Sequence, residues 1–234
     1  MAYNHLFSPI KIGSVEIPNR IALMPMGVLS PRMMNRDGSY TKDGADYYIE
    51  RAKGGTGLII TGIAPIPPGE FLPSIVNNPA TYTENTKYLA DGVHKYGSKV
   101  FIMISAMSGR AGTPGGIAPS ALPNVWNPRE LQREMTADEI RQYIEWFAIG
   151  AKAAKDAGVD GVEIHAVHEG YLLDQFAISS FNKRTDEYGG PLENRLRFAV
   201  EAVQAVKDRC GKDFPVSLRY SVKSYTKGFN RGAV

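Results

Sequence analysis

The chain has 234 residues, 43% of them hydrophobic, so it can bury a large core and is neither disordered nor fibrous. Its net charge is only +3, and its 27 Lys and Arg are scattered among 24 Asp and Glu, which argues against a nucleic-acid-binding surface. The first residues lack a signal-peptide pattern, and no segment approaches the ~20 apolar residues of a membrane span. We therefore expect a cytoplasmic protein, and its single cysteine, Cys210, excludes an internal disulfide or a multi-cysteine metal site in this chain.

Five segments are apolar almost throughout, as strands buried on both faces tend to be. They lie at residues 19–27, 57–64, 98–105, 159–165 and 214–221. Helical patterns lie between them at residues 40–53, 81–96, 136–157 and 191–209. The alternation of strand and helix predicts a parallel sheet with helices outside it.

Local signals add detail to this outline. Two short runs, 9–13 and 15–19, predict a hairpin that could cap one end of a barrel. Thr136 and Glu139 have capping-box spacing at the start of the third helix. In the fourth helix we expect an apolar stripe to face the core, formed by Leu192, Leu196, Ala199, Val203 and Val206.

The number of strands leaves two architectures open. A closed (β/α)8 barrel needs eight strands, and only five are recognisable here. The sheet is therefore either an open doubly wound one or part of a barrel that continues in a longer protein. The Gly- and Pro-rich segment 106–130 is the least regular part, and a loop of that length is usually functional.

Candidate functional residues stand where the predicted strands end, because ligands bind at the carboxyl ends of parallel strands. Glycines there would let a flat ligand approach the backbone, and Arg219 would supply a permanent cation. This set fits a planar anionic ligand. Its members are Pro25, Met26, Gly27, Thr61, Gly62, Ser105, His165, His168 and Arg219.

The densest group of titratable residues follows the fourth strand: His165, His168, Glu169 and Tyr171. Two histidines three residues apart could ligate a metal, but this requires a third ligand that the sequence does not supply nearby. They could also be structural. The third interpretation is hydrogen bonding or proton transfer to a ligand, with the phenol as a donor that keeps its proton at neutral pH.

Two long motifs resemble a known family. "HAVHEGYLLDQF" (165–176), followed by "NKRTDEYGGPLENRLRF" (182–198), resembles the central signature of the Old Yellow Enzyme family of flavin-dependent ene-reductases. Residues 6–26 and 58–65 are similar to its first two strands. The sequences of these motifs are most similar to those of the branch of large anaerobic enzymes that includes 2-enoate reductase, 2,4-dienoyl-CoA reductase and bile-acid steroid reductases.

The resemblance implies a (β/α)8 TIM barrel of the FMN-dependent type, incomplete here with about five of eight βα units and an N-terminal capping hairpin. Residues 1–234 would be the N-terminal portion of this single domain. The full-length protein would also bind [4Fe-4S], FAD and NAD(P)H outside this chain. A homo-oligomer is a further expectation for the protein.

The resemblance also implies roles for individual residues. His165 and His168 would bind the oxygen of an enoate or enone, and Tyr171 would protonate the α-carbon after hydride reaches the β-carbon from FMN N5. No metal site is implied. The flavin would contact Pro25, Met26, Gly27, Gly62, Met103 and Arg219, the last near N1 and the C2 carbonyl. Scaffold roles would fall to Arg184, Asp186, Asn194 and Arg195.

Two alternatives and two departures accompany these roles. A bile-acid steroid enone is the alternative substrate, and a non-catalytic fragment that cannot hold FMN is the alternative function. Many members have a glutamine where this chain has Met103 or Ile104. Glu169 stands as an inserted residue, so His168 or Glu169 could replace Tyr171 as the proton donor.

Overall fold

The computed structural model describes residues 3–26, 30–69, 73–168 and 171–221. The chain divides into two compact units, each built from three separate segments. The first unit comprises Met1–Ser105, Trp146–Ile164 and Ala205–Ser217. The second comprises Ala106–Glu145, His165–Gln204 and Leu218–Val234.

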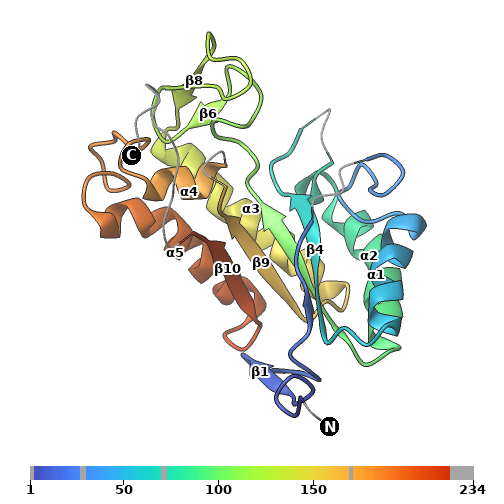
Figure 1. Cartoon of the computed structure of the whole chain (residues 1–234). Coiled ribbons are helices and arrows are strands. Elements are labelled where there is room, and N and C mark those ends of the chain that lie inside the picture. The colour runs from blue at the N-terminus through green and yellow to red at the C-terminus, as the bar shows by residue number, and fades with distance from the viewer. Residues whose placement is uncertain (1–2, 27–29, 70–72, 169–170, 222–234) are drawn as a thin grey trace. The chain divides into compact units, whose positions relative to one another are not determined.

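A parallel sheet forms the centre of the first unit (Figure 1). Its strands are β3 (Ala22–Leu23), β4 (Leu58–Pro65), β5 (Lys99–Ser105), β9 (Gly161–Ala166) and β10 (Val216–Tyr220), and the last residues of β9 and β10 belong to the second unit. The strand order is β10-β9-β5-β4-β3, so neighbours in the sheet follow the order of the chain. A doubly wound sheet would reverse direction partway. The architecture is therefore an incomplete (β/α)8 barrel fold.

The strands are buried on both faces, as their continuous apolar sequences predict. Every residue of β4 and β9 is buried, and so are all residues of β5 except Lys99. The core of the first unit includes Ile59, Val100, Ile102, Ile104, Val162 and Ile164, each with 0% exposure.

A bulge interrupts the pairing of β4 with β5. Ile60 pairs with Phe101 and Ile63 pairs with Met103, so two residues of β4, Thr61 and Gly62, stand opposite one residue of β5. A bulge of this kind leaves backbone groups without ladder partners, and bulges are over-represented next to active sites.

The predicted hairpin is confirmed. It consists of β1 (Ile10–Ile12) and β2 (Val15–Ile17), which pair antiparallel around Gly13 at φ 58°. Ser14 Oγ donates to the carbonyl oxygen of Asp213 at 2.8 Å, which ties the hairpin to the segment before β10.

All four predicted helices are present: α1 (Lys42–Lys53), α2 (Pro79–His94), α3 (Ala137–Asp156) and α5 (Leu192–Cys210). In the first unit, α1 and α2 lie together beside β4 and β5 (Figure 1). The capping box is confirmed, because the Thr136 amide donates to Glu139 Oε2 at 2.9 Å and the Glu139 amide donates to Thr136 Oγ1 at 3.2 Å. The sequence did not predict η1 (Ile75–Asn77) or α4 (Leu172–Ala177).

The apolar stripe predicted for α5 was partly wrong. Leu192 is 54% exposed and Leu196 is 39% exposed. Val206 is buried as predicted, and the other buried positions are Phe198, Ala202 and Cys210, so the buried residues are spaced by four. Both sets have helical spacing, so periodicity alone could not decide which one faces the core.

Residues 106–135 of the second unit form a small sheet where the sequence indicated an irregular loop. Its strands are β6 (Ile117–Ala118), β7 (Leu122–Pro123) and β8 (Leu131–Glu134), in the order β6-β8-β7. The Gln132 amide donates to the carbonyl oxygens of Gly109 at 2.7 Å and Thr113 at 3.0 Å. This segment is therefore built around specific hydrogen bonds.

Arg184 and Asp186 make the kinds of contact predicted for scaffold residues, an ion pair and backbone hydrogen bonds. Arg184 is 5% exposed and donates from Nη1 to the carbonyl oxygens of Pro119 at 3.1 Å and Met135 at 2.6 Å. Its pairing with Asp186 holds the pKa of that carboxyl below its usual value. No helix in the described part of the chain is long and apolar enough to cross a bilayer.

Candidate active site

The two histidines and the tyrosine predicted from the sequence lie together in the second unit. His165 is the fifth residue of β9, and its Nε2 lies 3.2 Å from Nδ1 of His168. The Tyr171 ring packs edge-on against the His165 ring, with centroids 4.9 Å apart and an interplanar angle of 86°. The His168 ring centroid is 6.4 Å from that of Tyr171. The three side chains therefore form one cluster.

The backbone at this position is unusual. His168 has φ 79°, in the left-handed region that residues other than glycine rarely adopt. Tyr171 directly precedes α4 and occupies its N-cap position without a capping hydrogen bond from its side chain. Strained residues of this kind are concentrated at ligand sites, where the surroundings hold them in place.

Burial keeps the histidine pair uncharged at neutral pH. His165 is 1% exposed, and desolvation, followed by the nearby His168 and Arg219, lowers its pKa to about 4. Desolvation and Arg219 also lower the pKa of His168, although that side chain is exposed. A neutral imidazole can donate one hydrogen bond and accept another.

One buried ring nitrogen of the pair lacks a hydrogen-bond partner among the described residues. This atom is Nδ1 of His165. Buried polar atoms normally have partners, and an exception needs an explanation, such as a ligand. Arg219, on β10, is half-buried and belongs to the same unit.

Apart from Arg219, the described residues predicted to contact a flat cofactor belong to the first unit. Pro25 is buried, Met26 is 69% exposed, and Met103 is 1% exposed on β5. Gly62 lies in the bulge of β4, where both of its backbone groups are already hydrogen-bonded to tyrosines. Sequence reasoning missed those tyrosines, Tyr40 and Tyr48.

Two residues of the predicted site, Gly27 and Glu169, lie outside the described residues. Within the described part of the chain, no group of three or more His, Cys, Asp or Glu side chains is arranged to hold a metal ion.

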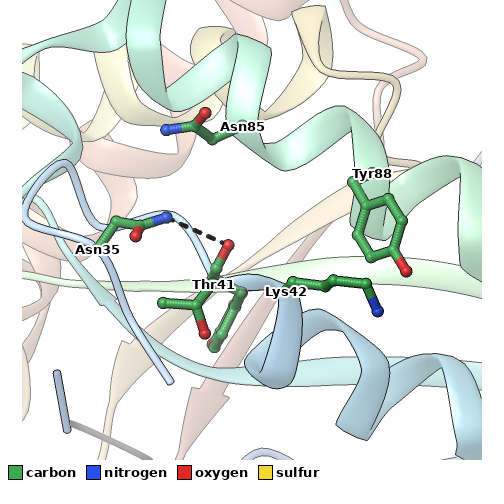
Figure 2. Close-up of a pocket in the computed structure, with 6 residues that line it drawn as sticks. Asn35, Thr41, Lys42, Asn85 and Tyr88 are labelled. Carbon is green, nitrogen blue, oxygen red and sulfur yellow. Dashed lines mark hydrogen bonds between the residues drawn. The ribbon is translucent and has the colours of Figure 1, made fainter. Parts of the chain in front are cut away.

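The first unit also contains a pocket of about 330 Å³ that the sequence did not indicate (Figure 2). Asn35 lies on one side of it, and Lys42 and Tyr88 lie on the other. Its lining residues are Asn35, Tyr40, Thr41, Lys42, Asn85 and Tyr88. The Asn35 amide donates to the carbonyl oxygen of Tyr40 at 3.3 Å, so the wall of the pocket is internally hydrogen-bonded.

Two characterised relatives match nearly all of this chain. Cinnamate reductase from Clostridium sporogenes is 51% identical over 99% of the chain, which spans 36% of that protein. NADH oxidase from Thermoanaerobacter brockii is 37% identical over 97% of the chain, again with 36% of the relative covered. The chain thus spans about a third of the length of these relatives.

A solved structure and a family model agree with these matches. An old yellow enzyme homologue from Zymomonas mobilis superimposes with a TM-score of 0.80 at 31% identity, over 95% of this chain and 65% of the other. Residues 5–231 match the model of the NADH:flavin oxidoreductase / NADH oxidase family, whose members use FMN. The chain belongs to the NADH:flavin oxidoreductase / NADH oxidase family, and its fold is that of the Old Yellow Enzyme homologues.

Proposed function

We propose that the protein that contains this chain is an FMN-dependent ene-reductase that reduces the activated C=C bond of a 2-enoate. The cluster of His165, His168 and Tyr171 carries the proposal, because it combines two neutral imidazoles with a phenol. The 51% identity to a protein named cinnamate reductase supports an aromatic enoate as the substrate. The activity is proposed for the whole protein, because this chain spans only about a third of the length of such relatives.

The residues proposed to contact FMN have a suitable chemistry. Pro25 has no amide proton, Met26 has an exposed apolar side chain, and Gly62 has no unsatisfied backbone group. Residues with so few free hydrogen-bonding groups fit the face of a flat ring better than they fit a phosphate. FMN, when bound, would supply hydride to the alkene. Arg219 is proposed as the cation that stabilises negative charge on the ring, and Gly27 and Met103 as further contacts.

The histidine pair is proposed to bind the carbonyl or carboxylate oxygen of the substrate. Two neutral imidazoles have two N–H groups between them, and the contact between His165 Nε2 and His168 Nδ1 uses one. In one tautomer the remaining N–H is on His168 Nε2, and in the other it is on His165 Nδ1. In either case one donor remains to draw electron density from the alkene toward the substrate oxygen.

Tyr171 is proposed to complete the reduction. Its phenol would donate a proton to the α-carbon as hydride reaches the β-carbon, so that the double bond gains one hydrogen at each carbon. The edge-on contact with His165 supports this role, because it would keep the phenol beside the group that binds the substrate oxygen.

The test is reoxidation of the photoreduced, FMN-reconstituted protein by cinnamate, followed by the visible absorption of the flavin. We expect Tyr171→Phe to slow this reaction by about 10²–10⁴-fold, the range for loss of a general acid. Reoxidation by ferricyanide, which takes electrons without a proton, should be unchanged. Tyr188→Phe is the matched control, because the Tyr188 hydroxyl belongs to the same unit but donates to Glu201 at 2.9 Å. An equal loss with both oxidants, or no reoxidation of the unaltered protein by any enoate, would contradict the proposal.

The chain covers only about a third of each of these relatives, which favours a second candidate: a chain that cannot hold FMN by itself. Gel filtration of the FMN-loaded 234-residue chain, beside the whole protein, distinguishes the two. Flavin that elutes with both supports binding by this chain. The relatives named NADH oxidase and NADPH dehydrogenase support NAD(P)H as the electron source, while [4Fe-4S] and FAD in the whole protein stay predictions.

A further inference from the structure

The backbone of Gly62 is held by two buried tyrosines of the first unit. The amide of Gly62 donates to the hydroxyl of Tyr48 at 2.8 Å, and its carbonyl oxygen accepts from the hydroxyl of Tyr40 at 2.9 Å. The hydroxyl of Tyr48 lies 3.4 Å from that of Tyr40. The two rings pack edge-on with centroids 5.0 Å apart and are 2% and 5% exposed.

These three contacts close a ring of hydrogen bonds with only one possible direction. Because the Gly62 amide donates to Tyr48, the Tyr48 proton is free to go to Tyr40, and the Tyr40 proton goes to the carbonyl oxygen of Gly62. Each phenol accepts one hydrogen bond and donates one. Burial raises the pKa of both tyrosines, that of Tyr40 well above its ordinary value, so both protons remain in place at neutral pH.

The two tyrosines supply Gly62 with hydrogen-bond partners that the bulge takes away from its backbone. Thr61 and Gly62 stand opposite a single residue of β5, so the ladder does not supply both partners for Gly62. An unpaired buried amide or carbonyl is costly, and a glycine without support can adopt many conformations. The tyrosines satisfy both groups with rigid side chains from α1 and from the residue preceding its N-cap.

We propose that Tyr40 and Tyr48 are positioning residues for the flavin, which fix the bulge of β4 so that Gly62 presents a flat, hydrogen-bond-satisfied backbone to the cofactor. The inference rests on the proposed function, in which Gly62 contacts FMN. It assigns the shape of that contact to two side chains that do not themselves touch the ligand.

The ring also predicts an order of effects. In Tyr40→Phe, the carbonyl oxygen of Gly62 keeps a second donor, Thr61 Oγ1, at 3.1 Å. In Tyr48→Phe, the Gly62 amide loses its acceptor. Tyr48→Phe should therefore have the larger effect.

Two measurements on the full protein test this inference. Without flavin, hydrogen–deuterium exchange of peptides that cover residues 58–65 should be at least about tenfold faster in Tyr48→Phe, and less accelerated in Tyr40→Phe. With flavin, the Kd for FMN should rise about tenfold in Tyr48→Phe and less in Tyr40→Phe. Tyr82→Phe is the matched control, since Tyr82 is 1% exposed in the same unit and has no contact with Gly62 among the hydrogen bonds above.

The outcomes separate this inference from the proposed function. If Tyr48→Phe and Tyr82→Phe change exchange at β4 and FMN affinity to the same extent, the tyrosines are ordinary core residues and the inference is overturned while the function stands. If the unaltered protein takes up no FMN, the proposed function fails and the inference fails with it. The inference is supported if, in both measurements, Tyr48→Phe has a larger effect than Tyr40→Phe and the control Tyr82→Phe has the smallest.

Discussion

At His165, burial and neighbouring charge act on the imidazole in the same direction. Water is excluded from the side chain, and protonation would place a second cation near Arg219. Both effects disfavour the imidazolium form. The residue is therefore suited to hydrogen bonding as a neutral group.

This lowered pKa predicts how stability depends on pH. Between pH 6.5 and about 4, the unfolded chain binds a proton at His165 that the folded chain does not, so the free energy of unfolding should fall as the pH falls through this range. The full shift corresponds to about 3 kcal/mol. Urea unfolding at pH 7, 5.5 and 4 should show a steeper loss for the unaltered chain than for His165→Asn. His5→Asn is the control, because His5 is exposed. The same dependence of stability on pH in the unaltered chain, His165→Asn and His5→Asn would contradict the expectation.

The candidate site was predictable where the chemistry is local in sequence. His165, His168 and Tyr171 lie within seven residues of one another, and His165 stands near the end of a strand that the sequence predicts. Tyr40 and Tyr48 gave no such signal, because they lie 22 and 14 residues before Gly62 and contact it only once α1 packs against β4. In the sequence they are ordinary aromatic residues of a helical segment.

At the scale of elements, length decided what could be predicted. The strands β4, β5 and β9 are long apolar runs, and each appears within two residues of its predicted bounds. The strands β6 and β7 have two residues each, too short for any periodicity, and hydrogen bonds from Gln132 hold their neighbourhood together. Tertiary contacts define these elements, so sequence patterns could not.

Helix α1 makes a close contact that reverses the usual effect of a glycine substitution. A Cβ on Gly44 would lie 2.2 Å from the carbonyl oxygen of Met33, which is backbone. Helix propensity alone predicts that Gly44→Ala stabilises the chain by about 1 kcal/mol. We expect it to destabilise the chain by about 1–3 kcal/mol, because the backbone cannot move aside. Urea denaturation measures the sign directly.

Gly92 in α2 provides the matched control. Its added Cβ would lie 2.3 Å from Cδ1 of Ile49, the end of a flexible side chain that can rotate away. Gly92→Ala should therefore lose less stability than Gly44→Ala. A gain of stability in Gly44→Ala would mean that the backbone at Met33 can move away from the added Cβ. The packing argument for α1 would then be wrong.

At the scale of the whole molecule, the two compact units share continuous helices. The division falls inside α3, between Glu145 and Trp146, and inside α5, between Gln204 and Ala205. If one unit unfolded alone, both helices would have to end in mid-course, where they have no caps. Helix ends without partners for their backbone groups are unfavourable.

We therefore expect the two units to unfold in one transition, and the chain supplies a probe for each. Its two tryptophans are divided between the units, with Trp126 in the second and Trp146 in the first. In each of the variants Trp146→Phe and Trp126→Phe, thermal unfolding can be followed by the fluorescence of the one remaining tryptophan and by far-UV circular dichroism. Within each variant, the two signals should give the same midpoint. The buried thiol of Cys210 should become reactive at that midpoint too. Two separate midpoints would mean that α3 and α5 fray at the division, and that each unit is stable by itself.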